Sequence, residues 1–197
     1  GSYVDIMQTN DGTWRTLANR GNQDSPIRFD GNGNMYYLVE ESTNSNWLHM
    51  IYKFNPKTGV SEQLVGQIPN TYYDEFYVSK DGLWLFAKAN RWQENSSSVS
   101  YLRAIPTTDV NNPVNLFYDS TGSSWLNNWI YDENSKNVYY IQGEAFYKIP
   151  YKDGTYDKEN KELLYGNDYN NSNNNYNVGY IWWETLLKDN YVDGVNN

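Results

Sequence analysis

The sequence predicts an all-β fold, a β-propeller built from four-stranded antiparallel blades. Two observations carry this prediction. Aromatic residues make up 17% of the 197 residues, with 20 Tyr and 8 Trp, and large rings favour pleated strands over helices. In addition, a pair of hairpins recurs about every 50 residues, which is the blade length of propeller repeats.

The first hairpin of each repeat joins a short strand to an aromatic-rich strand through a polar turn. The three examples are 27–30 with 35–39, 75–78 with 83–86, and 129–132 with 138–141. Their turns contain Gly, Asn, Asp, Ser and Lys, and several of these residues tolerate the positive φ of tight hairpins. A second hairpin follows each one: 48–54 with 61–65, 99–105 with 114–118, and 145–149 with 162–165. The predicted blades therefore span 26–66, 74–118 and 127–165.

The two ends of the chain are expected to complete a fourth blade. Residues 3–18 resemble a second hairpin and residues 178–195 resemble a first hairpin. Their pairing would remove exposed sheet edges and close a ring. Residues 1–197 are then one domain of three whole blades and one split blade, or else a fragment of a larger propeller. An alternative for 182–188 is a short helix.

A resemblance to a known class rests on turn motifs. The segment 52–59 (Tyr-Lys-Phe-Asn-Pro-Lys-Thr-Gly) and the turn pairs Asp81-Gly82 and Asp153-Gly154 resemble those of bacterial propeller proteins of the TolB and NHL-like class. The resemblance implies a propeller fold. It implies no function, because enzymes, receptors and scaffolds share such turns.

Composition excludes several classes of partner and site. A formal net charge of −9 without any Lys/Arg cluster argues against nucleic acid and anionic membranes as partners. Disulfides and thiolate metal sites are excluded because there is no Cys. No apolar run is long enough to insert into a membrane. Gly1-Ser2 is typical of a cloning scar, so an export signal would have been removed. The composition favours an exported bacterial protein, extracellular or on the cell surface, with a periplasmic or lipoprotein location as a variant.

No catalytic or cofactor motif is visible. The single histidine, His49, lies in a strand of alternating pattern and is interpreted as structural or solvated. Carboxylates near strand ends could pair across a sugar in a glycoside hydrolase, but solvated turn roles are the simpler interpretation. Oxygen-bearing side chains from Asp30 to Asn34 suggest a calcium loop. Because Met35 replaces the required glycine, a plain hairpin is preferred. We therefore expect no metal, no cofactor and no catalytic residue.

Aromatic residues gather in the loops that a propeller presents on one face. The connections expected to share that face are 19–25, 40–47, 67–74, 89–98, 119–126, 142–144 and 166–178. They carry the predicted ligand-binding residues Trp47, Tyr72, Tyr73, Trp92, Trp125, Tyr169 and Tyr176. Exposed rings beside amides suit a sugar or peptide groove. Alternatively, the same rings cap the ends of the blades.

The predicted function is a non-enzymatic binding domain that recognises a glycan or a protein through these aromatic loops. One alternative is a glycan-active enzyme with paired carboxylates at the propeller mouth. Another is a structural module of a larger surface protein. A deep cleft with facing carboxylates favours the enzyme, and a shallow aromatic shelf favours the binding domain.

Overall fold

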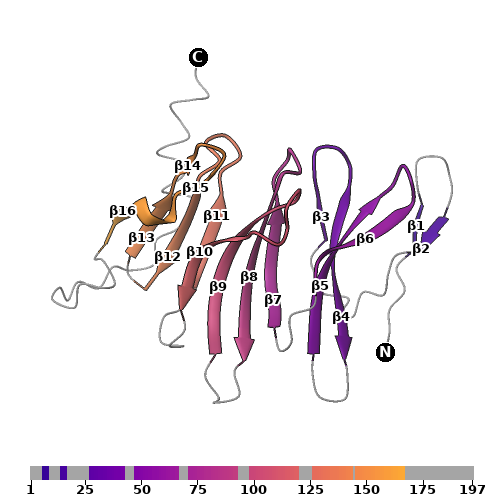
Figure 1. Cartoon of the computed structure of the whole chain (residues 1–197), viewed down its shortest axis with the longest axis horizontal. Coiled ribbons are helices and arrows are strands. Elements are labelled where there is room, and N and C mark those ends of the chain that lie inside the picture. The colour runs from indigo at the N-terminus through magenta and orange to yellow at the C-terminus, as the bar shows by residue number, and fades with distance from the viewer. Residues whose placement is uncertain are drawn as a thin grey trace.

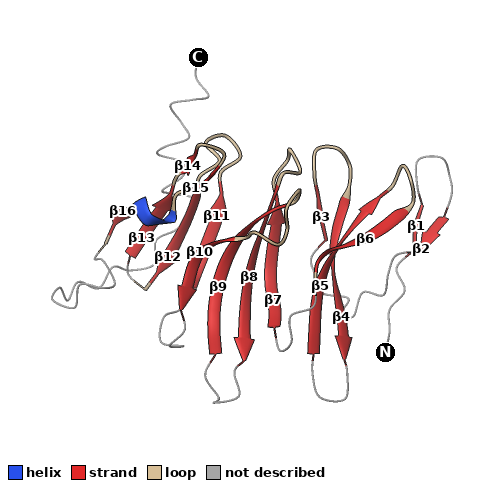
Figure 2. Ribbon diagram, viewed as in Figure 1, coloured by secondary structure: helices blue, strands red, loops and turns tan. Residues whose placement is uncertain are grey.

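Antiparallel strands account for nearly all the secondary structure of the residues that the structure describes (Figures 1 and 2). The computed structural model describes residues 6–8, 14–16, 27–42, 47–66, 71–92, 98–119, 126–143 and 145–166. Within this part the one helical element is a single 3-10 turn, η1 (Lys158–Asn160). The predicted all-β class is confirmed.

Twelve strands form three units of the same design. Unit 1 comprises β3 (Ile27–Phe29), β4 (Met35–Ser42), β5 (Trp47–Asn55) and β6 (Val60–Val65). Unit 2 comprises β7 (Thr71–Val78), β8 (Trp84–Trp92), β9 (Ser98–Pro106) and β10 (Val114–Asp119). Unit 3 comprises β11 (Leu126–Tyr131), β12 (Val138–Gln142), β13 (Ala145–Ile149) and β16 (Glu162–Tyr165). In each unit the four strands pair antiparallel in this order.

Smaller elements complete the described part. A two-stranded hairpin lies near the N-terminus, made of β1 (Ile6–Gln8) and β2 (Trp14–Thr16). A second one, β14 (Tyr151–Lys152) with β15 (Thr155–Tyr156), lies inside the connection from β13 to β16. One parallel pair, Leu48 with Thr71, joins unit 1 to unit 2 in a single eight-stranded sheet.

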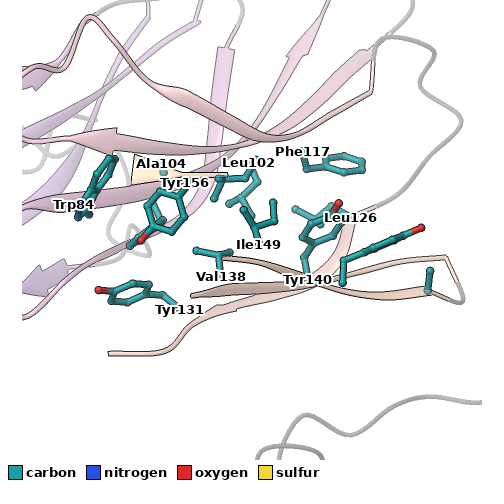
Figure 3. Close-up of a cluster of buried hydrophobic side chains, with 14 residues drawn as sticks. Trp84, Leu102, Ala104, Phe117, Leu126, Tyr131, Val138, Tyr140, Ile149 and Tyr156 are labelled. Atoms are coloured by element: carbon teal, nitrogen blue, oxygen red, sulfur yellow. The ribbon is translucent and has the colours of Figure 1, made fainter. Parts of the chain in front are cut away.

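The units pack face to face in a row, as the burial of side chains on both faces of β8 indicates. Its side chains alternate between the two faces of the sheet. Phe86 belongs to the cluster shared with unit 3 (Figure 3), whereas Leu85 and Ala87 belong to the cluster shared with unit 1; all three are 0% exposed. Unit 2 is therefore the middle layer of the described part.

Aromatic rings fill the contact between units 2 and 3. Phe86 stacks on Tyr131 with ring centroids 4.5 Å apart and meets the edge of Tyr156 at 5.7 Å. Trp84 also meets the edge of Tyr156, at 5.0 Å (Figure 3). Burying each ring contributes about 1.5–3 kcal/mol, and ring pairs at these distances add about 0.5–1.5 kcal/mol.

The outward faces of units 1 and 3 are buried as well. In unit 1, Tyr37, Met50 and Phe54 point away from unit 2 and are 0% exposed. In unit 3, Phe146 stacks on Tyr139 on the side away from unit 2 and is 5% exposed. Apolar surface is thus covered at both ends of the row of units.

The strands end at two opposite ends of the molecule (Figure 1). The turn end carries the tight turns at 30–34, 55–59, 79–83 and 132–137, together with the β9–β10 turn. The strand-tip end carries the last residues of β4, β8 and β12 and the first residues of β5, β7, β9 and β13. These names are kept below.

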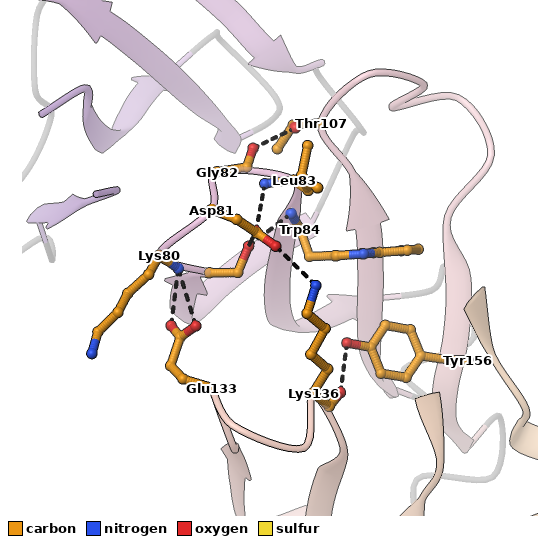
Figure 4. Close-up of polar contacts among 10 residues, drawn as sticks. Lys80, Asp81, Gly82, Leu83, Trp84, Thr107, Glu133, Lys136 and Tyr156 are labelled. Atoms are coloured by element: carbon orange, nitrogen blue, oxygen red, sulfur yellow. Dashed lines mark hydrogen bonds and ion pairs between the residues drawn. The ribbon is translucent and has the colours of Figure 1, made fainter. Parts of the chain in front are cut away.

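Hydrogen bonds run sideways along the turn end from unit to unit. The second residue of the first-hairpin turn is Gly31 in unit 1, Lys80 in unit 2 and Glu133 in unit 3. The Gly31 N–H donates to the Lys80 carbonyl at 2.7 Å. The Lys80 N–H in turn donates to both carboxylate oxygens of Glu133, at 3.0 and 3.2 Å (Figure 4). The second position of the turn therefore links successive units, through backbone groups in units 1 and 2 and through the Glu133 side chain in unit 3.

Charged side chains reinforce the link between units 2 and 3. Lys136 Nζ lies 3.2 Å from Asp81 Oδ2 (Figure 4). Burial alone would raise the pKa of Asp81, but hydrogen bonds from the Ser79 hydroxyl and the Leu83 N–H, together with Lys136, hold it below its ordinary value. The Tyr77 hydroxyl donates to Glu133 at 2.7 Å, and burial together with that carboxylate raises the pKa of Tyr77 to about 12.

The turn beginning at Asp30 is a hairpin, as expected, because β3 and β4 pair across it. The Asp30 carboxylate accepts the N–H groups of Asn32 and Asn34, the Asn34 amide and the Tyr36 hydroxyl. Burial would raise the pKa of Asp30, but these hydrogen bonds outweigh it and lower the pKa. The carboxylate thus orders its own turn, an Asx role that Asp commonly fills.

Replacing Gly31 with Ala tests the sideways link. A Cβ at this position would lie 2.7 Å from the Lys80 carbonyl oxygen, closer than real Cβ atoms come, so the two turns must separate. We expect Gly31→Ala to lower the free energy of unfolding by about 1–3 kcal/mol in urea titrations. Gly33→Ala is the control: Gly33 has φ +81° and open space around it, so only backbone strain of about 1 kcal/mol is expected. Equal losses in both variants would contradict the link.

Candidate functional site

The predicted binding residues Trp47 and Trp92 fall at the same end of the molecule. Trp47 is the first residue of β5 and Trp92 is the last residue of β8, both at the strand-tip end (Figure 1). The expectation that they lie in loops is wrong, because β4 and β8 keep pairing beyond their apolar parts. Ser42 still pairs with Trp47, and Trp92 with Ser98. Their side chains lie outside the described part, as do Trp125, Tyr169 and Tyr176.

Tyr72 and Tyr73 are also strand residues rather than loop residues, since both belong to β7. Tyr73 is 4% exposed and lies in the cluster between units 1 and 2, where burial raises its pKa. It is therefore a core residue, and the expectation that its ring faces a ligand is corrected. Tyr72 and Tyr73 point to opposite faces because neighbouring strand residues alternate. The bulge between Tyr73 and Glu75 then keeps Tyr73 on the same face as Phe76. Tyr72 points to the other face and stays partly exposed.

The face of β8 that meets unit 3 becomes polar from its middle toward the strand-tip end. On this face, Trp84 and Phe86 are buried at the turn end. Two residues further, the Lys88 side chain is 23% exposed, and Asn90 is partly exposed too. On the opposite face, Leu85, Ala87 and Ala89 all remain 0% exposed.

Three side chains from units 2 and 3 meet where this face becomes polar, near the middle of β7, β8 and β11. The Trp129 indole Nε1–H of β11 donates to Glu75 Oε1 of β7 at 2.5 Å. Lys88 Nζ lies 4.0 Å from the same oxygen. The Glu75 side chain is 46% exposed, so a ligand can reach it. Hydrogen bonds to charged groups are stronger than neutral ones, so Glu75 fixes the orientation of the indole.

Closer to the strand-tip end, a row of polar residues crosses unit 2. The strand register places Tyr72 opposite Asn90, Asn90 opposite Ser100, and Ser100 opposite Asp119. The Ser100 hydroxyl donates to Asn90 Oδ1 at 2.7 Å. Directly paired residues lie on the same face of a sheet. The register therefore aligns a phenol, an amide, a hydroxyl and a carboxylate at the strand-tip end.

The single histidine, His49, lies beside this row. Its Nδ1 accepts the backbone N–H of Tyr73 at 3.1 Å, so this nitrogen carries no proton. The other ring nitrogen, Nε2, lies 3.8 Å from Glu40 Oε2, and the ring meets the edge of the Tyr72 ring at 5.2 Å. His49 thus secures the start of β7 against unit 1, which supports the structural interpretation of this residue.

This polar group brings together side chains of several kinds. Glu75 accepts hydrogen bonds, Lys88 donates them, and Asn90 does both, while Tyr72 and Trp129 carry aromatic rings. At the turn end, Lys80, Asp81, Glu133 and Lys136 form contacts between neighbouring units.

Sequence reasoning missed Glu75, Lys88, Asn90 and Trp129 as members of one site. The single available signal was the break in alternation along 71–78, where Asp74 and Glu75 interrupt an otherwise aromatic strand. Such a break is typical of a bulge near a functional site. Among the described residues there is neither a cluster of three or more potential metal ligands nor a helix able to span a membrane.

Comparison with known proteins yields a likeness of fold. No family model and no curated protein matches the chain. Among solved structures, the chain is similar to the Pyrococcus horikoshii acylaminoacyl peptidase (orthorhombic crystal form), with a TM-score of 0.51 and 14% identity. The match covers 83% of this chain and 28% of that one. The chain thus spans about a quarter of the length of the peptidase, and at this identity the match speaks for the fold alone.

The hydrogen bond between Glu75 and Trp129 should contribute measurably to stability. We expect Glu75→Ala to lower the free energy of unfolding by about 0.5–1.5 kcal/mol, because the indole N–H loses its partner. Glu162→Ala is the matched control: this carboxylate is 50% exposed and pairs with Lys148 at 3.1 Å, but with no indole. Its loss should stay within about 0.5 kcal/mol. Urea unfolding of both variants measures the difference, and indistinguishable losses would contradict the assigned bond.

Proposed function

We propose that the chain is a four-bladed β-propeller in which units 1 to 3 are consecutive blades and residues from both ends of the chain form the fourth. Three observations support this: the common strand order of the units, their face-to-face packing, and the burial of Phe54 and Phe146 on the two outward faces. Buried outward faces are what a further blade between units 1 and 3 would produce.

If the two ends of the chain form the fourth blade together, the C-terminal segment contributes to the stability of the whole domain. Deleting residues 188–197 removes the segment expected to pair with residues 3–7, so the outward faces of units 1 and 3 lose cover together. We expect one cooperative thermal transition at a clearly lower temperature, because apolar burial is lost on the outward faces of both unit 1 and unit 3. Deletion of Gly1 and Ser2 serves as the control. An unchanged melting temperature after the C-terminal deletion would overturn closure.

We propose that this domain is a non-enzymatic binding module of an exported bacterial protein, acting at the cell surface or outside the cell and recognising a glycan or a protein. The observation that carries the proposal is the polar group on the face of β7 and β8 toward unit 3, where Tyr72, Lys88 and Trp129 stay partly exposed near Glu75. Binding sites combine ring surface with a few polar groups in this manner.

The contacts of the titratable groups favour binding over catalysis. His49 Nδ1 is occupied by a backbone N–H, so that atom cannot accept a proton from a substrate. Glu75 holds an indole and faces an ammonium group, which is a positioning role. Glycoside hydrolysis would require a second carboxylate across the sugar from Glu75.

Alanine variants distinguish aromatic rings that bind a ligand from aromatic rings that cap the ends of the blades. The proposal expects Tyr72→Ala and Trp92→Ala to weaken binding by about 1–3 kcal/mol on arrays of oligosaccharides and peptides, with little loss of stability. Tyr165→Ala on β16 is the control, because this ring is 55% exposed and lies on another strand edge. Losses of about 3–5 kcal/mol of folding stability in both site variants would instead identify the rings as caps. That result would contradict the binding proposal.

A further inference from the structure

We infer that His49 is a pH-sensitive contact between units 1 and 2. While its imidazole is neutral, the ring holds the start of β7 against β5, and when the imidazole takes up a proton the start of β7 is released. Three observations carry this: the hydrogen bond from Tyr73 to His49, its place beside the bridge between β5 and β7, and the Glu40 carboxylate near the other ring nitrogen. Such a contact is separate from the proposed binding function and does not depend on it.

The join between β5 and β7 is short. Leu48 pairs with Thr71, and this is the one pair that the described residues of the two strands form. Two residues further along β7, the Tyr73 N–H donates to His49 Nδ1 at 3.1 Å. A side chain of β5 thus extends the join beyond its single backbone pair. A change in that side chain can open the join locally, as strand ends with few contacts do, while the apolar cluster between the units stays intact.

The hydrogen bond from Tyr73 requires a neutral imidazole. Nδ1 accepts an N–H only while it carries no proton itself, and a protonated imidazole has a donor at both nitrogens. After protonation, two N–H groups would face each other across 3.1 Å, although the His49 side chain is only 11% exposed. A buried donor without an acceptor is destabilising. The protonated ring and the closed join therefore exclude each other.

Glu40 offers the charged ring a different partner. It pairs with His49 across β4 and β5, and its Oε2 lies 3.8 Å from His49 Nε2. The Glu40 side chain is 18% exposed, so water screens its attraction to an imidazolium only in part. The neutral ring is thus held by Tyr73 and the charged ring by Glu40, which gives the contact two states.

Three other charged residues lie at this level on the strands around His49. They are Glu41 on β4, Asp74 on β7 and Arg91 on β8. Arg91 is exposed, so water screens its repulsion of an imidazolium. The side chains of Glu41 and Asp74 lie outside the described part. Glu40 is the carboxylate that the structure places beside the ring.

The change of state reaches the neighbouring tyrosine as well. The Tyr72 ring meets the edge of the His49 ring at 5.2 Å, so a turn of the imidazole toward Glu40 removes this contact. Histidine ordinarily titrates near pH 6.5, whereas a phenol stays neutral up to about pH 10. The join is therefore closed above about pH 6.5 and opens progressively as the pH falls below that value.

NMR tests the contact directly, because the chain has a single histidine. The imidazole of nitrogen-15-labelled protein and the hydrogen exchange of the Tyr73 amide are followed from about pH 8 to about pH 5, with exchange rates corrected for their intrinsic pH dependence. We expect Nδ1 to carry no proton at the upper end. The opening equilibrium at Tyr73 should then rise by up to about tenfold per pH unit below about pH 6.5. The amide of Ala87, a core residue of β8, should stay protected.

Variants assign the effect to particular groups. His49→Asn keeps an acceptor near the place of Nδ1 but does not titrate, so the Tyr73 amide should stay protected at every pH. Glu40→Gln removes the partner of the charged ring and should move the onset of opening down by about 0.5–1 pH unit. Glu62→Gln is the matched control, because this carboxylate belongs to unit 1 but lies on β6 opposite Lys53. The control should leave the onset unchanged.

Three results would overturn the pH-sensitive contact. One is a Tyr73 amide that responds to pH no more in the unaltered protein than in His49→Asn. Another is uptake of a proton by Nδ1 while Tyr73 stays protected, a result that can be read from the unaltered protein even where a variant does not fold. The third is an equal loss of protection at Tyr73 and Ala87, which is global acid unfolding. None of these measurements uses a ligand, so failure here leaves the proposed binding function standing.

Discussion

The burial of β8 on both faces is the constraint on which the arrangement of the three units depends. Phe86 packs on unit 3 and Ala87 packs on unit 1, both without exposed surface. A strand segment buried on both sides does not carry charges, which explains the apolar stretch from Trp84 to Ala87 in the first half of β8. Lys88, at the middle of the strand, is the first partly exposed residue on the face toward unit 3.

The two ends of the molecule use their polar groups differently. At the turn end, backbone and side-chain groups of adjacent units satisfy one another, as Lys80 and Glu133 do. Such contacts hold the units in register. Near the middle of their strands, Glu75 and Trp129 join units 2 and 3 but leave part of their surface exposed.

Much of the secondary structure could be predicted from the sequence, because alternation and turn chemistry are local. The turn after Asp30 and the hairpin pairing around it are examples. Strand ends were harder to predict: Glu40 to Ser42 and Asn90 to Trp92 are mostly polar, yet they continue the ladder. The burial of Tyr73 depends on the bulge after it and on unit 1. The site was beyond reach, because Glu75 and Trp129 meet only through the packing of two units that are separate in the sequence.

The sideways hydrogen bonds at the turn end also give the row of units a direction. Unit 1 contributes a glycine, whose lack of a side chain lets the Lys80 carbonyl approach to 2.7 Å, whereas unit 3 contributes the Glu133 carboxylate in place of a carbonyl. The contact between units 1 and 2 therefore differs from the contact between units 2 and 3, although the units share one strand order. Putting unit 2 or unit 3 in the place of unit 1 would bring a side chain to the position where Gly31 lets the Lys80 carbonyl approach. The place of unit 1 in the row is consequently fixed by a single residue.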